Sequence, residues 1–198
     1  MDFTIHQYLL ATEPSILFAT GTVQQAERSL PEIEEMLGED PWTTSSSPIW
    51  SRTNTEASAF SWRDIPMRRS YARDWPPGNC PGWGWSATAW PLTGTRSSRR
   101  GDISLKTITY PCEVHLQDGI IAYEQNSCIL YSSDLMQSPG DGRDTVEECG
   151  YLPRAESISP VRIPNEKGLE DTKRKLASIS PRFVAVGHGF CFVNADIM

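Results

Sequence analysis

The sequence predicts a mixed fold of strands and helices, an α/β or α+β sandwich, in one domain. Short apolar segments bounded by turn residues alternate with two amphipathic helical segments, which is the pattern of such folds. The chain has 198 residues, of which 38% are hydrophobic, so it can bury a sizeable core. A third observation limits the prediction, because all seven tryptophans lie between Trp42 and Trp90.

Three elements are predicted before that tryptophan-rich stretch. Residues 3–10 alternate well enough for a strand that includes His6, and residues 15–19 continue as a second strand after a turn. A helix is predicted over 23–37, where apolar residues recur at helical spacing and Gly38 can cap the end. His6 is interpreted as a partly buried strand histidine without a chemical role.

The elements predicted after the stretch are four strands, one loop and one helix. The strands are short and apolar, the loop contains turn residues, and the helix is charged and amphipathic. The strands cover 103–110, 120–123, 129–131 and 183–186, the loop covers 138–142, and the helix covers 165–179.

The tract between residues 42 and 100 differs in composition from its flanks. It holds eight Arg, no Lys and three acidic residues, a net charge of +5, whereas the remaining 139 residues carry −12. It contains no Val, one Leu and two Ile, which cannot supply the core of strands and helices over that length. A single domain over residues 1–198, interrupted by this atypical tract, is therefore predicted.

Charge and cysteine content exclude several classes of protein. The net charge of −7 argues against a nucleic-acid partner, although a surface for single strands or a disordered linker remains open for the tract itself. Apolar runs are too short for a membrane span, and the first residues lack the pattern of a signal peptide. Five cysteines without a C-x-x-C pair indicate reduced thiols and a cytoplasmic protein.

Two histidines and one aspartate follow short apolar strands and are candidate metal ligands. His115, His188 and Asp134 offer imidazole nitrogen and carboxylate oxygen, the donors that iron and zinc accept. On spacing alone, a plain turn histidine also explains His188.

These residues stand in a motif order that resembles a known family. His115-Leu116-Gln117-Asp118, then Ser132-Ser133-Asp134, then Gly187-His188-Gly189 are similar to the metallo-β-lactamase-fold domain of flavodiiron proteins and the related oxygen-binding diiron proteins. The resemblance covers residues 1–40 and 101–192 and implies an αββα sandwich. It implies that His115 and His188 are metal ligands, that Asp134 bridges two irons, and that Asp118 either orients an imidazole or is a turn residue.

The sequence departs from the family's pattern in two places. The remaining ligands of the family come from an H-x-E-x-D motif expected near residues 45–55, where this chain has neither imidazole nor carboxylate. The flavodoxin domain that carries FMN is also absent, so no FMN is expected on this chain alone.

A shifted reading frame explains the tract. Each new codon would take the last base of one residue's codon and the first two of the next. Regrouped in this way, residues 48–57 permit H-M-E-S-D-E-Y-G-G, residues 66–73 permit D-A-T-V-V-C, and residues 93–98 permit G-D-E-I-V. The first string is the missing motif at its expected place. The alternative is a genuine tryptophan-rich insertion.

Taken together, the resemblance implies a non-haem diiron protein that binds or reduces dioxygen or nitric oxide. Two irons would be held in intact relatives, electrons would come from a separate flavin or iron protein, and a homodimer is possible. The literal chain is expected to be impaired, and whether it is an enzyme stays open. Two alternatives remain: a zinc-dependent hydrolase on the same fold, and a non-catalytic sensor, binding module or degenerate copy.

Overall fold

A computed structural model describes residues 4–12, 16–18, 23–37, 44–46, 70–71, 96–100, 103–111, 119–140, 142 and 146–197. Contacts between Cα atoms divide the chain into two compact units. The first unit comprises Met1–His6, Gly94–Arg99 and Ser104–Met198, and the second comprises Gln7–Thr93 and Arg100–Ile103.

Among the described residues of the second unit are helix α1 (Val23–Leu37) and a four-stranded sheet. β1 (Tyr8–Leu10) and β2 (Ile16–Phe18) form an antiparallel hairpin, to which β3 (Thr44–Ser46) and β4 (Ser70–Tyr71) add in parallel. Helix α1 (Val23–Leu37) coincides with the predicted range. Its Ile33 is buried with Leu17 of β2, so the apolar stripe of the helix covers the hairpin.

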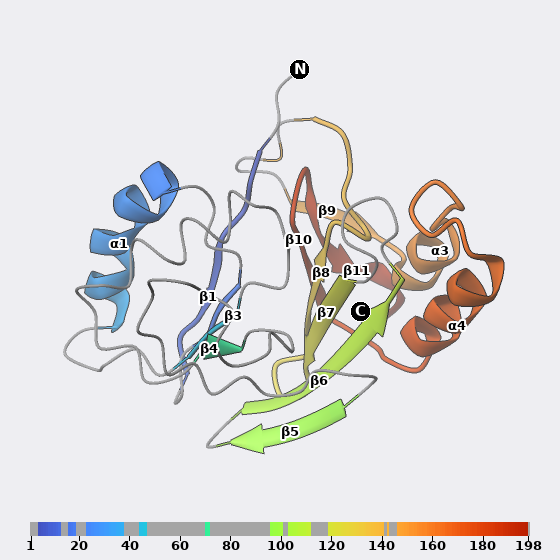
Figure 1. Ribbon diagram of the computed structural model, residues 1–198, viewed down its shortest axis with the longest axis horizontal. Coiled ribbons are helices and arrows are strands. Elements are labelled where there is room, and N and C mark those ends of the chain that lie inside the picture. The colour runs from blue at the N-terminus through green and yellow to red at the C-terminus, as the bar shows by residue number, and fades with distance from the viewer. Residues whose placement is uncertain are drawn as a thin grey trace, which may run out of the picture. The chain divides into compact units, whose positions relative to one another are not determined.

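A seven-stranded sheet lies mainly in the first unit, in the order β5-β6-β7-β8-β10-β11-β9 (Figure 1). β6, β7 and β8 form an antiparallel meander, β10 runs parallel to β8, and β11 turns back against β10 and pairs in parallel with β9. The strands are β5 (Arg96–Arg100), β6 (Ile103–Tyr110), β7 (Gly119–Glu124), β8 (Ile129–Ser133), β9 (Val146–Cys149), β10 (Phe183–Val186) and β11 (Cys191–Asn194).

The core of this unit is built from the apolar central strands. Fully buried side chains come from β6, β7, β8, β10 and β11, and each stabilises the fold by roughly 1.5–3 kcal/mol relative to an exposed position. They include Ile108, Ile121, Leu130, Val184, Val186 and Phe192. Near-continuous apolar sequence in β7, β8 and β10 is therefore explained by burial on both faces.

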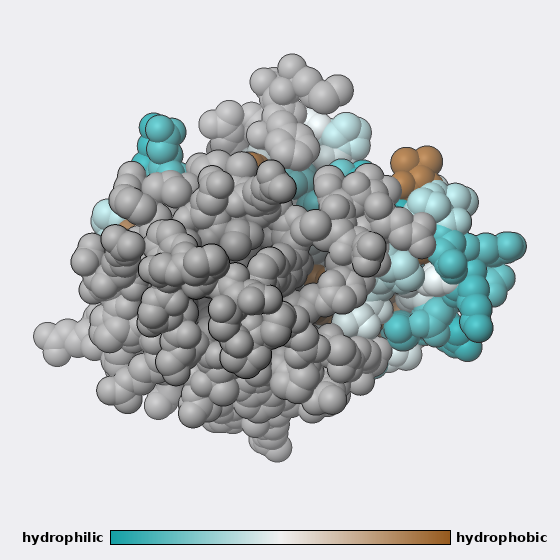
Figure 2. All heavy atoms as spheres, in the orientation of Figure 1, coloured by the Kyte–Doolittle hydropathy of each residue, from teal (hydrophilic) through white to brown (hydrophobic). Residues whose placement is uncertain are grey.

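Helices α3 (Tyr151–Glu156) and α4 (Glu166–Ala177) lie side by side next to the sheet (Figure 1). The hydroxyl of Tyr151 donates to the carbonyl of Leu176 at 3.1 Å, and Lys173 Nζ donates to the carbonyl of Glu156 at 2.5 Å. The outer surface over these helices is strongly hydrophilic (Figure 2). The pair therefore forms an amphipathic layer whose apolar side faces the sheet.

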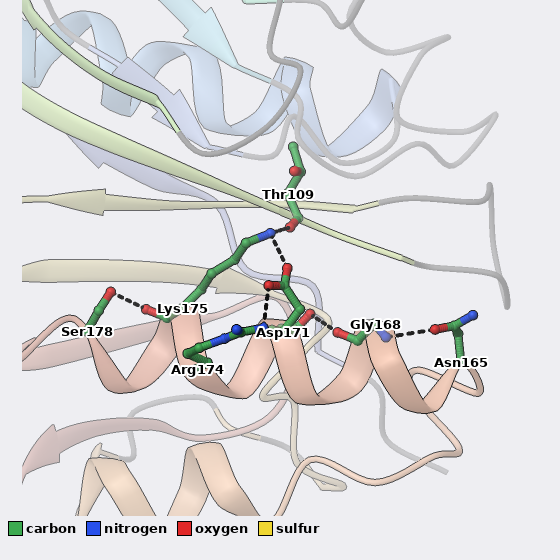
Figure 3. Close-up of polar contacts among 8 residues, drawn as sticks. Thr109, Asn165, Gly168, Asp171, Arg174, Lys175 and Ser178 are labelled. Atoms are coloured by element: carbon green, nitrogen blue, oxygen red, sulfur yellow. Dashed lines mark hydrogen bonds and ion pairs between the residues drawn. The ribbon is translucent and has the colours of Figure 1, made fainter.

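Polar contacts define both the start and the docking of α4 (Figure 3). Asn165 caps the helix, since its Oδ1 accepts from the backbone N–H of Gly168 at 2.7 Å. Lys175 Nζ pairs with Asp171 at 2.7 Å and donates to the carbonyl of Thr109 in β6 at 3.2 Å. One lysine therefore links the helix to the sheet.

Two buried polar side chains hold turns at the same end of the sheet, where β7 and β11 end and β8 and β10 begin. Glu124 accepts from Ser104 N at 2.9 Å and from Ser127 N and Oγ at 2.6 and 2.7 Å. Asn194 accepts from the backbone N–H groups of Tyr151 and Asp196, each at 3.0 Å, and its Nδ2 donates to Pro181 O at 2.9 Å. Both groups are satisfied, as buried polar groups require.

The predicted mixed fold class is confirmed, with differences at the ends of elements. β1 is shorter than predicted and begins at Tyr8, so His6 lies before the strand. The prediction missed β9, α3, β11 and the terminal 3-10 helix η1 (Ala195–Ile197). It also missed β3, β4 and β5, which lie within the atypical tract 42–100. In the part of the chain that the structure describes, no helix is long and apolar enough to cross a membrane. The single-domain prediction remains a prediction.

Candidate metal centre

The structure brings together two of the predicted site residues. His188 Nε2 lies 3.2 Å from Asp134 Oδ1, and both side chains are largely withdrawn from water, with exposed fractions of 13% and 16%. His115 and Asp118 lie outside the described residues. One imidazole and one carboxylate thus converge at a single point, from segments 54 residues apart in sequence.

Parallel pairing of β8 and β10 accounts for this convergence. The two strands end at the same edge of the sheet, because Val186 pairs with Ser133. The register shifts between Ala185 and Val186, so one residue of β8 is bulged out, and Ser133 has a positive φ of 51°. Such irregularities re-aim the chain at a strand end, and here they place Asp134 beside the loop that follows β10.

Glycines on both sides of His188 leave room for the site. A Cβ at Gly187 would lie 2.8 Å from Asp134 Oδ1, closer than ordinary contacts allow. Gly189 has a φ of +82°, and a Cβ there would lie 2.1 Å from the carbonyl oxygen of Ser138. The Gly-His-Gly sequence is therefore a steric requirement of the loop.

Each ring nitrogen of His188 faces a hydrogen-bond acceptor. Nδ1 lies 2.8 Å from the carbonyl oxygen of Thr4, and because a carbonyl only accepts, this nitrogen donates. Nε2 faces the Asp134 carboxylate. Nε2 and the Asp134 carboxylate are therefore placed to share either a proton or a bound cation.

The electrostatics of the ring follow from the same contacts. Burial acts to lower the pKa of His188, but the hydrogen bonds to Asp134 and Thr4 outweigh burial and the repulsion of Arg162. The pKa of His188 is raised as a result. The surroundings therefore favour positive charge at this position.

The donor chemistry fits a metal ion at Nε2 and Asp134. Histidine ligands typically donate their other ring N–H to a carbonyl, which is the role that Thr4 O takes for Nδ1. The described residues supply only these two donors: no group of three or more His, Cys, Asp or Glu side chains occurs within them. The described residues therefore fit part of a metal site.

Two supporting residues were missed by the sequence interpretation. Thr4 acts through its backbone carbonyl, so no sequence signal could identify it. His6 was interpreted as a strand residue, but its Nε2 lies 2.7 Å from the carbonyl of Gly189 in the site loop. The chain has only three histidines, and this scarcity was the signal in the sequence that could have pointed to a role for His6.

Comparisons with known proteins bear on the fold. No protein-family model and no curated protein matches the chain by sequence. Among solved structures, the chain is similar to rubredoxin oxygen:oxidoreductase from Desulfovibrio gigas, with a TM-score of 0.71 and 15% identity over 99% of this chain and 51% of that chain. It is also similar to a metal-soaked Flv1 flavodiiron core from Synechocystis sp. PCC6803, with a TM-score of 0.76 and 14% identity over 96% and 49%.

A third similar structure is the chemotaxis sensor ODP, described as a peroxy diiron species. Its TM-score is 0.72, with 16% identity over 98% of this chain and 86% of that chain. The chain thus spans about half the length of the two flavodiiron-type structures and most of the sensor. At these identities the similarity shows the fold, and the predicted metallo-β-lactamase-like fold, as in flavodiiron proteins, is confirmed.

Proposed function

We propose that the chain is a diiron-type protein of the flavodiiron class in which His188 and Asp134 form part of the metal site. The observation that carries this proposal is the 3.2 Å approach of His188 Nε2 to Asp134 Oδ1 at the shared end of two parallel strands. The similarity in fold to a flavodiiron core and to a diiron sensor supports iron as the metal.

The residues of the chain have distinct roles in this proposal. Asp134 supplies a carboxylate that can bridge two cations, and His188 supplies Nε2 while Thr4 O holds Nδ1. Bound iron would supply the capacity to bind a diatomic molecule, dioxygen or nitric oxide, and to exchange electrons. Electrons would come from a separate donor protein of flavin or iron type.

The number of ligands limits what the literal chain can do. With His115 included, the sequence offers three of the family's ligands, because the H-x-E-x-D motif is missing. Metal affinity depends on ligand number and on the groups that hold the ligands. We therefore propose weak metal binding and little or no oxidase activity for this chain.

Anaerobic titration of the metal-free chain with Fe²⁺ tests the proposal. The expected result is fewer than two irons per chain, with binding lost in His188→Ala and in Asp134→Ala but retained in the exposed control Glu170→Gln. Binding that is unchanged by both site substitutions would overturn the proposed site. Two tightly bound irons per chain would overturn the proposal that the site is incomplete.

A second candidate is a sensor or binding module without turnover. The similarity to the chemotaxis sensor ODP, over 98% of this chain, favours it. Dioxygen or nitric oxide consumption, assayed with a chemical reductant on the iron-loaded chain, separates the two. Turnover favours the oxidoreductase, whereas a spectral change on gas binding without turnover favours the sensor.

A further inference from the structure

His6 contacts the site loop on both sides of His188. Its backbone N–H donates to the carbonyl of Gly187 at 3.1 Å, and its ring Nε2 donates to the carbonyl of Gly189 at 2.7 Å. His188 is therefore bracketed by two hydrogen bonds from a single residue 182 positions earlier in the chain. The first contact is available to any residue except proline, but the second requires this side chain.

The peptide that accepts the ring bond has little room to move. Gly189 adopts a positive φ of +82°. On its other side, a Cβ at Gly142 would lie 1.7 Å from Gly189 O, so this oxygen is packed directly against the Gly142 backbone. The His6 ring therefore fixes the orientation of a carbonyl that only glycine at position 142 leaves space for.

The segment that carries His6 also touches the ring of His188. Thr4, two residues before His6, accepts from His188 Nδ1 at 2.8 Å. Anchoring His6 to the loop thus holds the Thr4 carbonyl at a fixed distance from the imidazole. Which ring nitrogen of a histidine carries the proton is set by the hydrogen bond that the other nitrogen makes.

We propose that His6 is a positioning residue: by tying residues 4–6 to the loop 187–189, it keeps the proton on Nδ1 of His188 and leaves Nε2 directed at Asp134. This inference rests on the proposed metal site for its purpose, but its structural content does not depend on a bound metal. His6 touches neither metal nor substrate and acts only through His188.

Three substitutions at position 6 separate positioning from general packing. Glutamine places an amide N–H near the position of the imidazole Nε2 and can preserve the bond to Gly189. Leucine removes the donor, and asparagine is polar but too short to reach. Two readouts are used: Co²⁺ affinity by isothermal titration, and the protonated nitrogen of the His188 ring by ¹⁵N NMR of the metal-free chain, recorded at a pH where the ring is neutral.

If His6 is a positioning residue, His6→Leu and His6→Asn should weaken Co²⁺ binding by about tenfold. Substitution of supporting residues at metal sites typically has an effect of this size. The same variants should shift the His188 proton from Nδ1 toward Nε2, while His6→Gln stays within about threefold of the parent chain. If His6→Leu does not fold, His6→Asn decides.

Two results would overturn the inference: unchanged ring protonation in the asparagine variant, or glutamine as damaging as leucine. If the parent chain binds Co²⁺ no better than His188→Ala does, the proposed metal site fails. The NMR readout still decides the role of His6 in that case.

Discussion

The Asp134 carboxylate lies against Gly187 so closely that a Cβ at position 187 would stand 2.8 Å from Oδ1. Changing Gly187 to alanine therefore has to displace the carboxylate or the adjacent backbone of Ser133. Overpacking of this kind costs about 1–3 kcal/mol, and we expect metal affinity to fall by about tenfold. Anaerobic Fe²⁺ titration and thermal unfolding check both values, and an unaltered affinity in Gly187→Ala would contradict the site geometry.

Glu124 should make stability depend on pH. Burial raises the pKa of Glu124, but the hydrogen bonds from Ser127 and Ser104 outweigh it, so the pKa lies below the ordinary value of 4.5. A lowered pKa means that the stabilisation is fully present above about pH 4.5 and is lost as pH falls through the pKa of the folded state.

Glu124→Gln removes the charge of the carboxylate but keeps the shape of the side chain. It turns an amide N–H toward the N–H or O–H groups that donate to Glu124. We expect a loss of about 1.5–3 kcal/mol at pH 7, shrinking below pH 4. Urea unfolding of the parent chain and of Glu124→Gln at several pH values between pH 7 and below pH 4 measures this loss of stability. The exposed Glu170→Gln serves as control and should stay within about 0.5 kcal/mol of the parent chain.

Lys175 and Arg174 form a matched pair around Asp171. Lys175 Nζ is bound to Asp171 and to the carbonyl of Thr109, with 28% of the side chain exposed, whereas Arg174 is 75% exposed and pairs only with Asp171 among the contacts described. Lys175→Met should destabilise the chain by about 1 kcal/mol, because α4 loses its polar link to β6. Arg174→Met should cost less than about 0.5 kcal/mol. Equal effects in thermal or urea unfolding would contradict this assignment.

Asn194 and Asn165 allow the same substitution in two environments. Buried Asn194 uses both ends of its amide, so Asn194→Asp removes the donor to Pro181 O and introduces a buried charge. We expect destabilisation of about 2–3 kcal/mol at pH 7. Asn165→Asp keeps the cap oxygen at the start of α4 and should be nearly neutral. Urea unfolding of both variants tests the contrast, and a nearly neutral Asn194→Asp would contradict the network.

The tract between residues 42 and 100 yields a prediction at the level of DNA. Sequencing the region that encodes residues 38–102 should reveal a one-base slip near residues 40–42 that opens a frame encoding H-x-E-x-D. A chain expressed from the corrected frame should hold near two irons, measured by metal analysis, against little iron in the present chain. Absence of such a frame would favour a genuine insertion.

The spacing of apolar residues predicted those elements in which the apolar residues are the buried ones. α1, β6 and β10 have the predicted ranges, since apolar residues in each recur at the spacing of one buried face or form a buried run. β9 was missed because only alternate residues of Val146–Cys149 are partly covered and two of the four are glutamates. α3 contains Pro153 and one helical turn and a half, too little for a periodic signal.

The candidate metal site remains a prediction, and only part of its observed geometry could be read from the sequence. Asp134 and His188 could be found because their donor atoms and strand-end positions are visible in the sequence. The roles of Thr4 and Gly187 could not, because one acts through a backbone carbonyl and the other through the absence of a side chain. Pairing of β8 with β10, which no local pattern reveals, joins the two predicted residues.

The contact between Thr4 and His188 spans 184 positions, so it sets an order of events in the cell. During synthesis the segment that contains Thr4 emerges first, and it can contact the imidazole of His188 only after nearly all of the polypeptide has been made. Contacts of such high sequence separation form late and slow folding. Until then the histidine has no fixed orientation, so the finished geometry at Asp134 reports that the intervening strands have assembled.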